Sequence, residues 1–416
     1  MLAVYNFFLA LYRAGIGISA LYNNKAALWI EGRKNWKQQL IAATNDNEKR
    51  IWIHCSSLGE FEQGRPLIEL LKQQYPTYKI LLTFFSPSGY EACKNYKGAD
   101  TIMYLPIDSK KNAETFITIS KPALAIFVKY EFWHYYLNEL KTQNIPTLVI
   151  ASAFRKEQAF FKWYGGFFRK MLSCFTQIHV QDSLSAQLLQ HIGYHENVIV
   201  TGDTRYDRVS AISAGIRTIP EAETFKGSCK VLIAGSTWPE DEELLHKCIT
   251  TLHDEWKLII APHEVHSKHI QQIVQLFGKE TVLFSQLATS NALYNKRILI
   301  IDNIGMLSSL YAYGDIAYVG GGFQKGGIHN TLEPAVFGIP VVIGPVYRKF
   351  VEAVSLVKAG AVFPAKDEYD AKKIIAQLVS DNQLRNNILI VLQQFMKDNT
   401  GAAARILTAI SNNKLL

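Results

Sequence analysis

Cysteine is scarce in this chain of 416 residues, and its spacing gives it no evident structural role. The five cysteines are an odd number, lie far apart, and form neither a Cys-x-x-Cys pair nor a cluster with histidine. This pattern argues against a disulfide framework and a structural zinc site, and it fits a reducing compartment. Low-complexity tracts and short repeats are also absent. With 48% hydrophobic and 19% charged residues, the chain as a whole is not disordered.

Acidic residues are fewer in the first half of the chain, which gives the two halves different net charges. Residues 1–205 contain 23 basic and 16 acidic side chains, whereas residues 206–416 contain 21 and 20. A protein coated for nucleic acid would be basic throughout, so we expect no nucleic-acid partner. The excess of positive charge predicts that the first half faces an anionic partner.

One long apolar segment, residues 1–22, opens the chain, and Arg13 is its only charged residue. A secretory signal would place its cations before the apolar run, whereas here they follow it. About 20 apolar residues suffice to span a bilayer. We therefore expect a membrane-associated helix that spans the membrane or lies on it, with the following basic residues on the cytoplasmic side. A helix packed against the protein is the alternative.

A second segment, residues 159–172, combines aromatic and basic side chains. Its aromatic and basic residues include Phe160, Phe161, Lys162, Trp163, Phe167, Arg169 and Lys170. This composition suits the headgroup region of an anionic membrane or a groove for acyl chains. It equally suits a core helix whose cations reach the surface.

Thirteen short apolar runs, from 51–55 to 361–364, alternate with helical stretches. Strands that are apolar on both faces and separated by helices are typical of parallel sheets in α/β domains. We predict two doubly wound, Rossmann-like domains. The predicted ranges are an N-terminal domain over 23–205, a connector over 206–228, a second domain over 229–368, and C-terminal helices over 369–416 that pack back toward the first domain.

Parallel sheets bind ligands beyond the carboxyl ends of their strands, and in the second half the unusual residues follow strands. Gly320 and Gly321 follow a strand in VGGGFQKGGIHNTLEP, where we predict that a helix opens near Asn330. Glycines admit a phosphate close to the backbone, and a helix N-terminus favours an anion. Glu333 can accept from two ribose hydroxyls. Purely structural glycines are the alternative.

Three further loops follow strands in the second half. Ser236 can bind a phosphate oxygen or cap a helix. His263, after Pro262, can stack on a base or be an ordinary exposed loop residue. Residues 302–307 form either a pyrimidine-reading turn, through the backbone of Gly305, Met306 and Leu307, or a simple turn.

In the first half, two carboxylates and one cation follow strands. Glu60 lies at a predicted helix start, where it can act as a general base or only complement the helix dipole. Glu131 follows another strand in KYEFW. Arg205 follows the last strand, where it can neutralise charge on a leaving phosphate or form an interdomain ion pair.

The motifs SSLGEFEQGRPLIE, TFFSPSGYE, KYEFW, ASAFR, TGDTRYD, AGSTWPEDEE and GGIHNTLEPAVFGIPVVIGP occur in this order. In this the chain resembles the 3-deoxy-D-manno-octulosonic acid (Kdo) transferases of lipopolysaccharide synthesis over nearly its whole length. The resemblance implies a GT-B fold with a cleft between two domains, CMP-Kdo as donor in the C-terminal domain, and a lipid A precursor as acceptor at the N-terminal domain. It also implies an inverting enzyme at the cytoplasmic face of the inner membrane. We expect no cofactor and no metal, since no Asp-x-Asp-type pair is suited to holding one.

Carried over by motif, the family's catalytic base falls on Glu60, a transition-state-supporting carboxylate on Glu131, and a basic residue on Arg205. The CMP contacts fall on Pro262, His263, Gly305, Met306, Leu307, Asn330, Thr331, Leu332 and Glu333. The chain departs from the family at two positions. Asp203 replaces an Asn of the TGN-x-K motif, and the Arg of a common PRH motif is missing beside His263.

Two rival functions share parts of this pattern. Another GT-B enzyme, such as a UDP-sugar transferase or a nucleotide-sugar 2-epimerase, would share the late glycine–glutamate block but lack the SSLGEF and KYEFW pair. A membrane-bound sugar-nucleotide sensor on the same fold would bind a CMP-sugar without turnover.

Overall fold

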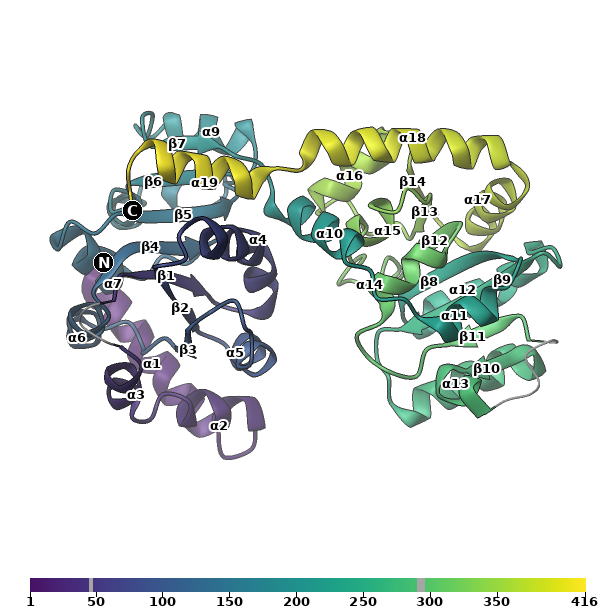
Figure 1. Cartoon of the computed structure of the whole chain (residues 1–416), viewed down its shortest axis with the longest axis horizontal. Coiled ribbons are helices and arrows are strands. Elements are labelled where there is room, and N and C mark those ends of the chain that lie inside the picture. Colours follow the sequence, from purple (N-terminus) through teal and green to yellow (C-terminus); the bar gives the residue numbers. More distant parts are fainter. Residues whose placement is uncertain (45–47, 290–295) are drawn as a thin grey trace. The chain divides into compact units, whose positions relative to one another are not determined.

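The computed structural model describes residues 1–44, 48–289 and 296–416. By its internal contacts the chain forms two compact units (Figure 1). Unit 1 comprises Met1–Arg208 and Thr400–Leu416, and unit 2 comprises Val209–Asn399.

Unit 1 is built on a seven-stranded parallel sheet with the order β3-β2-β1-β4-β5-β6-β7. Its strands are β1 (Arg50–Cys55), β2 (Lys79–Phe84), β3 (Thr101–Tyr104), β4 (Pro122–Val128), β5 (Thr147–Ser152), β6 (Gln177–Val180) and β7 (Val198–Val200). All six residues of β1 are buried, because helices cover both faces of the sheet. This confirms the predicted doubly wound architecture for the first half.

The helices of unit 1 divide between the two faces of the sheet. They are α1 (Leu2–Ser19), α2 (Asn24–Glu31), α3 (Trp36–Ala43), α4 (Leu58–Gln74), α5 (Pro87–Cys93), α6 (Lys110–Ser120), α7 (His134–Thr142), α8 (Gly166–Leu172), α9 (Ser183–Gln190) and α19 (Ala402–Asn412), with the 3-10 turn η1 (Ala159–Phe161). One core joins α3, α6, α7, α8 and α9 to the face of β1 that carries Trp52. The other joins α4, α5 and α19 to the face that carries Ile51 and Ile53.

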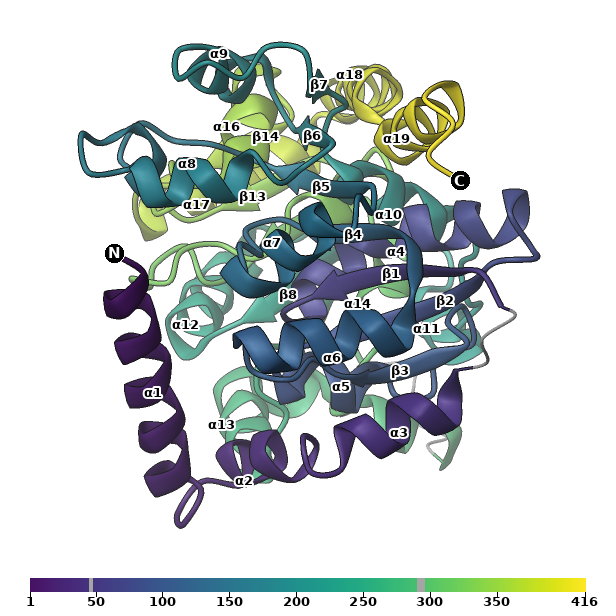
Figure 2. The same ribbon diagram turned by 90° about the vertical axis from the view of Figure 1, so that its left-hand side faces the viewer.

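Helix α1 lies on the outside of unit 1 (Figure 2). None of its residues is buried, and it is long and apolar enough to cross a membrane by length and composition. It contacts the domain through hydrogen bonds and aromatic rings. The Tyr5 hydroxyl donates to Asp108 at 2.5 Å, and the Tyr135 hydroxyl donates to Asn6 at 2.9 Å. The ring of Tyr5 also packs against Phe167, and that of Tyr12 stacks on Phe85.

The aromatic segment 159–172 is two short elements rather than one helix, since η1 and α8 are separated by an irregular stretch. Phe160 is buried in the core, and Phe161, Phe167 and Phe168 pack against that core. Arg169 donates to the Phe160 and Lys162 carbonyls, so its charge also holds this turn. By contrast, Trp163 is 92% exposed and Lys170 is exposed as well. The core interpretation therefore holds for the phenylalanines, and contact with a membrane stays a prediction for the exposed residues.

The chain returns to unit 1 only in its last helix. Asp207 accepts hydrogen bonds from the backbone N–H groups of Gly401 and Ala403 at 2.6 and 3.1 Å, which caps α19. Ile406 and Ile410 then pack in the core beneath α4. The predicted domain ranges remain predictions, and the compact units break the predicted C-terminal range at Thr400.

Unit 2 contains a second seven-stranded parallel sheet with the order β10-β11-β9-β8-β12-β13-β14. Its strands are β8 (Lys230–Thr237), β9 (Trp256–Pro262), β10 (Thr281–Leu283), β11 (Ile298–Ile300), β12 (Ile316–Val319), β13 (Val341–Ile343) and β14 (Val362–Pro364). Its helices are α11 (Pro220–Lys226), α12 (Pro239–Cys248), α13 (Ser267–Phe277), α14 (Leu307–Leu310), α15 (Leu332–Ala335), α16 (Val351–Lys358), α17 (Glu368–Ser380) and α18 (Asn382–Asn399), while α10 (Thr204–Ala214) begins in unit 1. The prediction missed β10, which has only three residues.

Candidate active site

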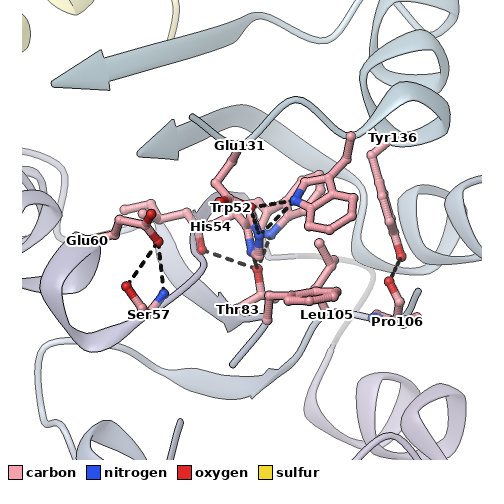
Figure 3. Close-up of polar contacts among 12 residues, drawn as sticks. Trp52, His54, Ser57, Glu60, Thr83, Leu105, Pro106, Glu131 and Tyr136 are labelled. Atoms are coloured by element: carbon pink, nitrogen blue, oxygen red, sulfur yellow. Dashed lines mark hydrogen bonds and ion pairs between the residues drawn. The ribbon is translucent and has the colours of Figure 1, made fainter. Parts of the chain in front are cut away.

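Glu60 lies in the first turn of α4, directly after β1 (Figure 3). Its carboxylate accepts from the backbone N–H of Ser57 at 2.9 Å, which is half of a capping box. The sequence left open whether Glu60 is a base or only stabilises the helix start. The cap is present, and the half-buried carboxylate also lies within electrostatic reach of a second one.

That second carboxylate is Glu131, which follows β4 and is only 7% exposed. Two ring N–H groups converge on its Oε2. His54 Nε2 lies 3.1 Å away, and the indole nitrogen of Trp133 lies 2.6 Å away. These contacts hold a nearly buried carboxylate in place.

A chain of hydrogen bonds fixes the tautomer of His54 (Figure 3). An ionised carboxylate can only accept, so we assign the ring proton of neutral His54 to Nε2, which donates to Glu131. His54 Nδ1 then accepts from the Thr83 hydroxyl at 2.9 Å, and this hydroxyl accepts from the Trp52 indole N–H at 2.8 Å. Two side chains thus contact one carboxylate oxygen, and two more lie behind His54.

Burial raises the pKa of Glu60, and the negative charge of Glu131 raises it further. Hydrogen bonds from Ser57 and Ser56 act in the opposite direction. A carboxylate with a raised pKa binds a proton more strongly, which is the property required of a general base. The pair therefore suits proton removal from a substrate hydroxyl.

Arg205 lies at the start of α10, where its guanidinium pairs with Asp203 at 2.7 Å. Asp203 also accepts from the backbone N–H of Arg205 at 2.9 Å. The residue at which the chain departs from the family motif is therefore a direct partner of the predicted phosphate-neutralising cation. This pair lies wholly within unit 1.

In unit 2, the glycine turn after β12 is tied to the sheet and to α12. Gly320 donates its N–H to the Gly235 carbonyl at 2.9 Å, and Gly321 donates its N–H to Asp241 at 2.8 Å. Asp241 also accepts from the Tyr318 hydroxyl at 2.6 Å. Both glycine N–H groups thus donate to acceptors within the protein. Their role as phosphate donors stays a prediction.

The same glycines allow close backbone packing. A Cβ at Gly320 would lie 2.4 Å from the Ser236 carbonyl oxygen, and a Cβ at Gly322 would lie 2.5 Å from Gly344. Gly326, later in the turn, faces open space. The first glycines are therefore required by packing, which supports the structural alternative stated above.

Ser236 and His263 lie at neighbouring strand ends, since β8 pairs with β9. Ser236 has a left-handed backbone with φ of 53°, which is uncommon outside glycine and costs energy. The exposed ring of His263 stacks on Trp238 and on His329, with centroid distances of 4.7 and 4.4 Å. Trp238 donates its indole N–H to His329 at 3.1 Å, so both rings lie on one side of His263. Burial lowers the pKa of His329, and the neighbouring His263 lowers it further.

The two remaining predicted nucleotide loops differ in their regularity. Gly305 has φ of 96°, and Met306 then caps the four-residue helix α14, which begins at Leu307. The helix predicted to open near Asn330 begins at Leu332 and ends after one turn, so it offers little helix dipole. Asn330 donates its side-chain amide to Glu333 at 3.0 Å and accepts from the Leu332 N–H.

Thr331 is fully buried before this turn, and its hydroxyl finds no hydrogen-bond partner in the described part of the chain. Pro262 is likewise buried, as the last residue of β9. Across the described residues, 1–44, 48–289 and 296–416, no group of three or more His, Cys, Asp or Glu side chains suits a metal ion.

Sequence reasoning missed His54, Thr83, Trp133 and Asp241. His54 and Thr83 are neighbours because β1 and β2 pair in parallel with these two residues in register. Each lies inside an apolar strand, where a polar residue is itself a signal, because a buried polar group needs a partner. Asp241 follows the Trp238–Pro239 start of α12, and its partner Gly321 lies 80 residues away.

Comparison with known proteins identifies the family. Residues 34–208 match the model of the 3-deoxy-D-manno-octulosonic-acid transferase (kdotransferase) family. A 3-deoxy-D-manno-octulosonic acid transferase of Haemophilus influenzae is 30% identical over 371 residues, which are 86% of this chain and 85% of the relative. The chain belongs to the Kdo transferase family. The corresponding enzyme of Aquifex aeolicus is 29% identical over 79% of this chain and 86% of its own length. The predicted family and a glycosyltransferase of lipopolysaccharide synthesis are thereby confirmed.

Solved structures confirm the GT-B fold of this Kdo transferase. A UDP-GlcNAc 2-epimerase from Neisseria meningitidis aligns with a TM-score of 0.63 at 17% identity, covering 87% of this chain and all of that chain. MurG from Acinetobacter baumannii aligns with a TM-score of 0.54 at 13% identity, covering 88% and 99%. At these identities the likeness concerns the fold alone.

Proposed function

We propose that this Kdo transferase moves Kdo from CMP-Kdo to a lipid A precursor, with inversion at the anomeric carbon. The observation that carries this proposal is the pair of carboxylates, Glu60 and Glu131, after neighbouring strands of unit 1. Family membership supports Kdo as the sugar that is transferred. The raised pKa of Glu60, caused by burial and by Glu131, supports a base that removes a proton from an acceptor hydroxyl.

In the proposed reaction, an acceptor hydroxyl transfers its proton to Glu60 as its oxygen attacks the anomeric carbon of Kdo. The bond from that carbon to the CMP phosphate breaks on the opposite face, and CMP leaves with the bonding electrons. Glu131, which His54 and Trp133 hold in position, stabilises positive charge that develops on the sugar. No atom beyond donor and acceptor is needed to balance this step.

Unit 2 carries the groups that we assign to CMP-Kdo. The exposed His263 ring is supported from one side by Trp238 and His329, and its other side suits stacking on the cytosine. We assign Glu333 to the ribose hydroxyls and the hydroxyl of Ser236 to a phosphate oxygen. Gly305, Met306 and Leu307 remain the proposed contacts to the pyrimidine edge.

We place the enzyme at the cytoplasmic face of the inner membrane. The apolar surface of α1, the exposed Trp163 and Lys170 and the partly exposed Lys162 support contact with an anionic leaflet. In this assignment the basic half of the chain faces a phosphorylated lipid. The nearly neutral half holds one nucleotide through local contacts.

One experiment tests the donor, the acceptor and the stereochemistry together. The purified full chain is incubated with lipid IVA, Kdo, CTP and a CMP-Kdo synthetase, and the mass of the lipid product is measured by mass spectrometry. We expect a gain of one or more Kdo residues and release of CMP. NMR of the product then gives the anomeric configuration, which must be opposite to that of the donor. Tight CMP-Kdo binding without a Kdo-lipid product would instead support a sensor.

A further inference from the structure

Two adjoining hollows lie between α1 and the catalytic edge of unit 1. The first, of about 390 Å³, is lined by Tyr5, Glu131, Trp133, Phe160 and Phe168 among others. The second, of about 620 Å³, is lined by Tyr5, Phe8, Leu9, Phe85 and Trp133 among others. Both share Tyr5 and Trp133. Each volume lies within the roughly 300–1,000 Å³ of small-ligand pockets.

The lining of both hollows is mainly apolar. Among the described residues that line the first hollow, Glu131 is the only charged one, and Gln158 and Tyr130 add polar groups. The second hollow is lined by aromatic and aliphatic residues. An apolar chain fits this lining, and a polar group at one end of it would lie near Glu131, beside the proposed base.

The outer wall of the second hollow is α1, which hydrogen bonds and ring contacts hold in place. Tyr5 donates to Asp108, and Asp108 also accepts from the backbone N–H groups of Tyr135 and Tyr136 at 3.1 Å each. Asp108 thus ties α1 to the start of α7, directly after the segment that contains Glu131 and Trp133. The wall and the carboxylate are parts of one connected arrangement.

We propose that these two hollows form a binding site for one acyl chain of the acceptor lipid, with the N-terminal helix as its outer wall. This inference rests on the proposed function, because it takes the acceptor to be an acylated sugar. A chain that leaves the acceptor sugar near Glu131 passes Trp133 and Tyr5 and lies along Phe8 and Leu9. The helix then serves as part of the substrate site as well as a membrane contact.

Two neighbouring phenylalanines separate this role from simple anchoring. Phe7 and Phe8 are 60% and 63% exposed on the same helix, but only Phe8 lines either hollow. F8A and F7A therefore remove equal apolar area from a membrane contact, whereas only F8A removes a wall of the acyl site.

The kinetic test uses the full chain with synthetic acceptors whose acyl chains differ in length, at saturating CMP-Kdo. Each buried methylene lowers the acceptor KM by about fourfold. We expect wild type and F7A to share a steep dependence of KM on chain length. We expect F8A to weaken the dependence of KM on chain length and to raise KM for the longest chain about tenfold. Equal losses in F7A and F8A, with the dependence intact, would overturn the acyl site.

A second measurement does not depend on turnover, so it separates failure of this site from failure of the proposed function. A single-chain lipid probe with a diazirine on its acyl chain is photolysed with the full chain, and labelled residues are located by mass spectrometry. We expect labels on Tyr5, Phe8 and Trp133, and their loss in F8A. Labels confined to the outward residues Phe7 and Ile18, or no labels, would overturn the proposal even if Kdo transfer is observed.

Discussion

The candidate sites of the two units of this Kdo transferase differ in which chemical groups form them. In unit 1 the site consists of side chains, because Trp52, Thr83, His54 and Trp133 lead through hydrogen bonds to Glu131. In unit 2 the site consists of close backbone packing at Gly320 and Gly322 and of stacked rings. A side-chain site is broken by removing a charge, and a backbone site is broken by adding volume. The following predictions use this difference.

The largest effect is expected from removing the charge of Glu60. E60Q keeps the shape of the side chain and its contact with Ser57 but cannot accept the substrate proton. We expect kcat to fall about 10²–10⁴-fold, the usual contribution of a general base. Steady-state assays of Kdo transfer measure this, with isothermal titration to show that donor binding is retained.

The matched control is E69Q on the same helix. Glu69 forms a partly exposed pair with Arg65, and such pairs contribute about 1 kcal/mol or less to stability. We expect this variant to retain normal turnover. A near wild-type rate for E60Q would remove Glu60 from the proposed chemistry.

The second prediction concerns pH and the coupling of the two carboxylates. Glu60 acts only when deprotonated, so the rate rises with pH through its pKa. The negative charge of Glu131 raises this pKa, and E131Q removes that charge. We expect the acidic limb of the kcat profile in E131Q to move to lower pH, while the maximal rate falls. A limb that stays in place would show that Glu131 does not influence the charge of Glu60.

The third prediction tests the backbone site by adding a methyl group. In G322A, the new Cβ lies 2.5 Å from Gly344, and overpacking of this kind costs about 1–3 kcal/mol. We expect urea unfolding to show this loss and donor affinity to fall with it. G326A, in the same turn but facing open space, is the control, and we expect both quantities to stay near wild type. Equal stability of the two variants would contradict the assigned packing.

The same comparison explains how much of this molecule was predictable from its sequence. The apolar strands were predicted because burial on both faces leaves continuous hydrophobic runs, and Glu60 and Glu131 were singled out as candidates because each follows such a strand. His54 was missed as a partner of Glu131, and Thr83 as a partner of His54, because these pairs are 77 and 29 residues apart along the chain. Sheet register, which local patterns do not define, brings His54 and Thr83 together.

The glycine turn was predicted as a feature, but its partner was not. Asp241 was seen only as part of an acidic helix start, whereas it accepts the Gly321 N–H and the Tyr318 hydroxyl across the sheet. The helix expected near Asn330 proved to be a single turn, and Gly338, with φ of 75°, follows shortly after it. Local patterns thus located the loops, while long-range packing decided which polar groups remain for a ligand.

The smallest effect is expected at Asp203, where this chain differs from its family. D203N keeps an oxygen that accepts from the Arg205 backbone N–H but removes the charge that pairs with its guanidinium. Because the pair is partly exposed, we expect stability to change by less than about 1 kcal/mol. Because D203N removes a charge that competes with the leaving phosphate for Arg205, we expect kcat to rise a few-fold. R205A serves as the opposite variant and should lower kcat with either residue at position 203. If D203N lowers kcat as much as R205A does, the prediction is wrong. The Asp203 carboxylate would then take part in donor binding together with Arg205.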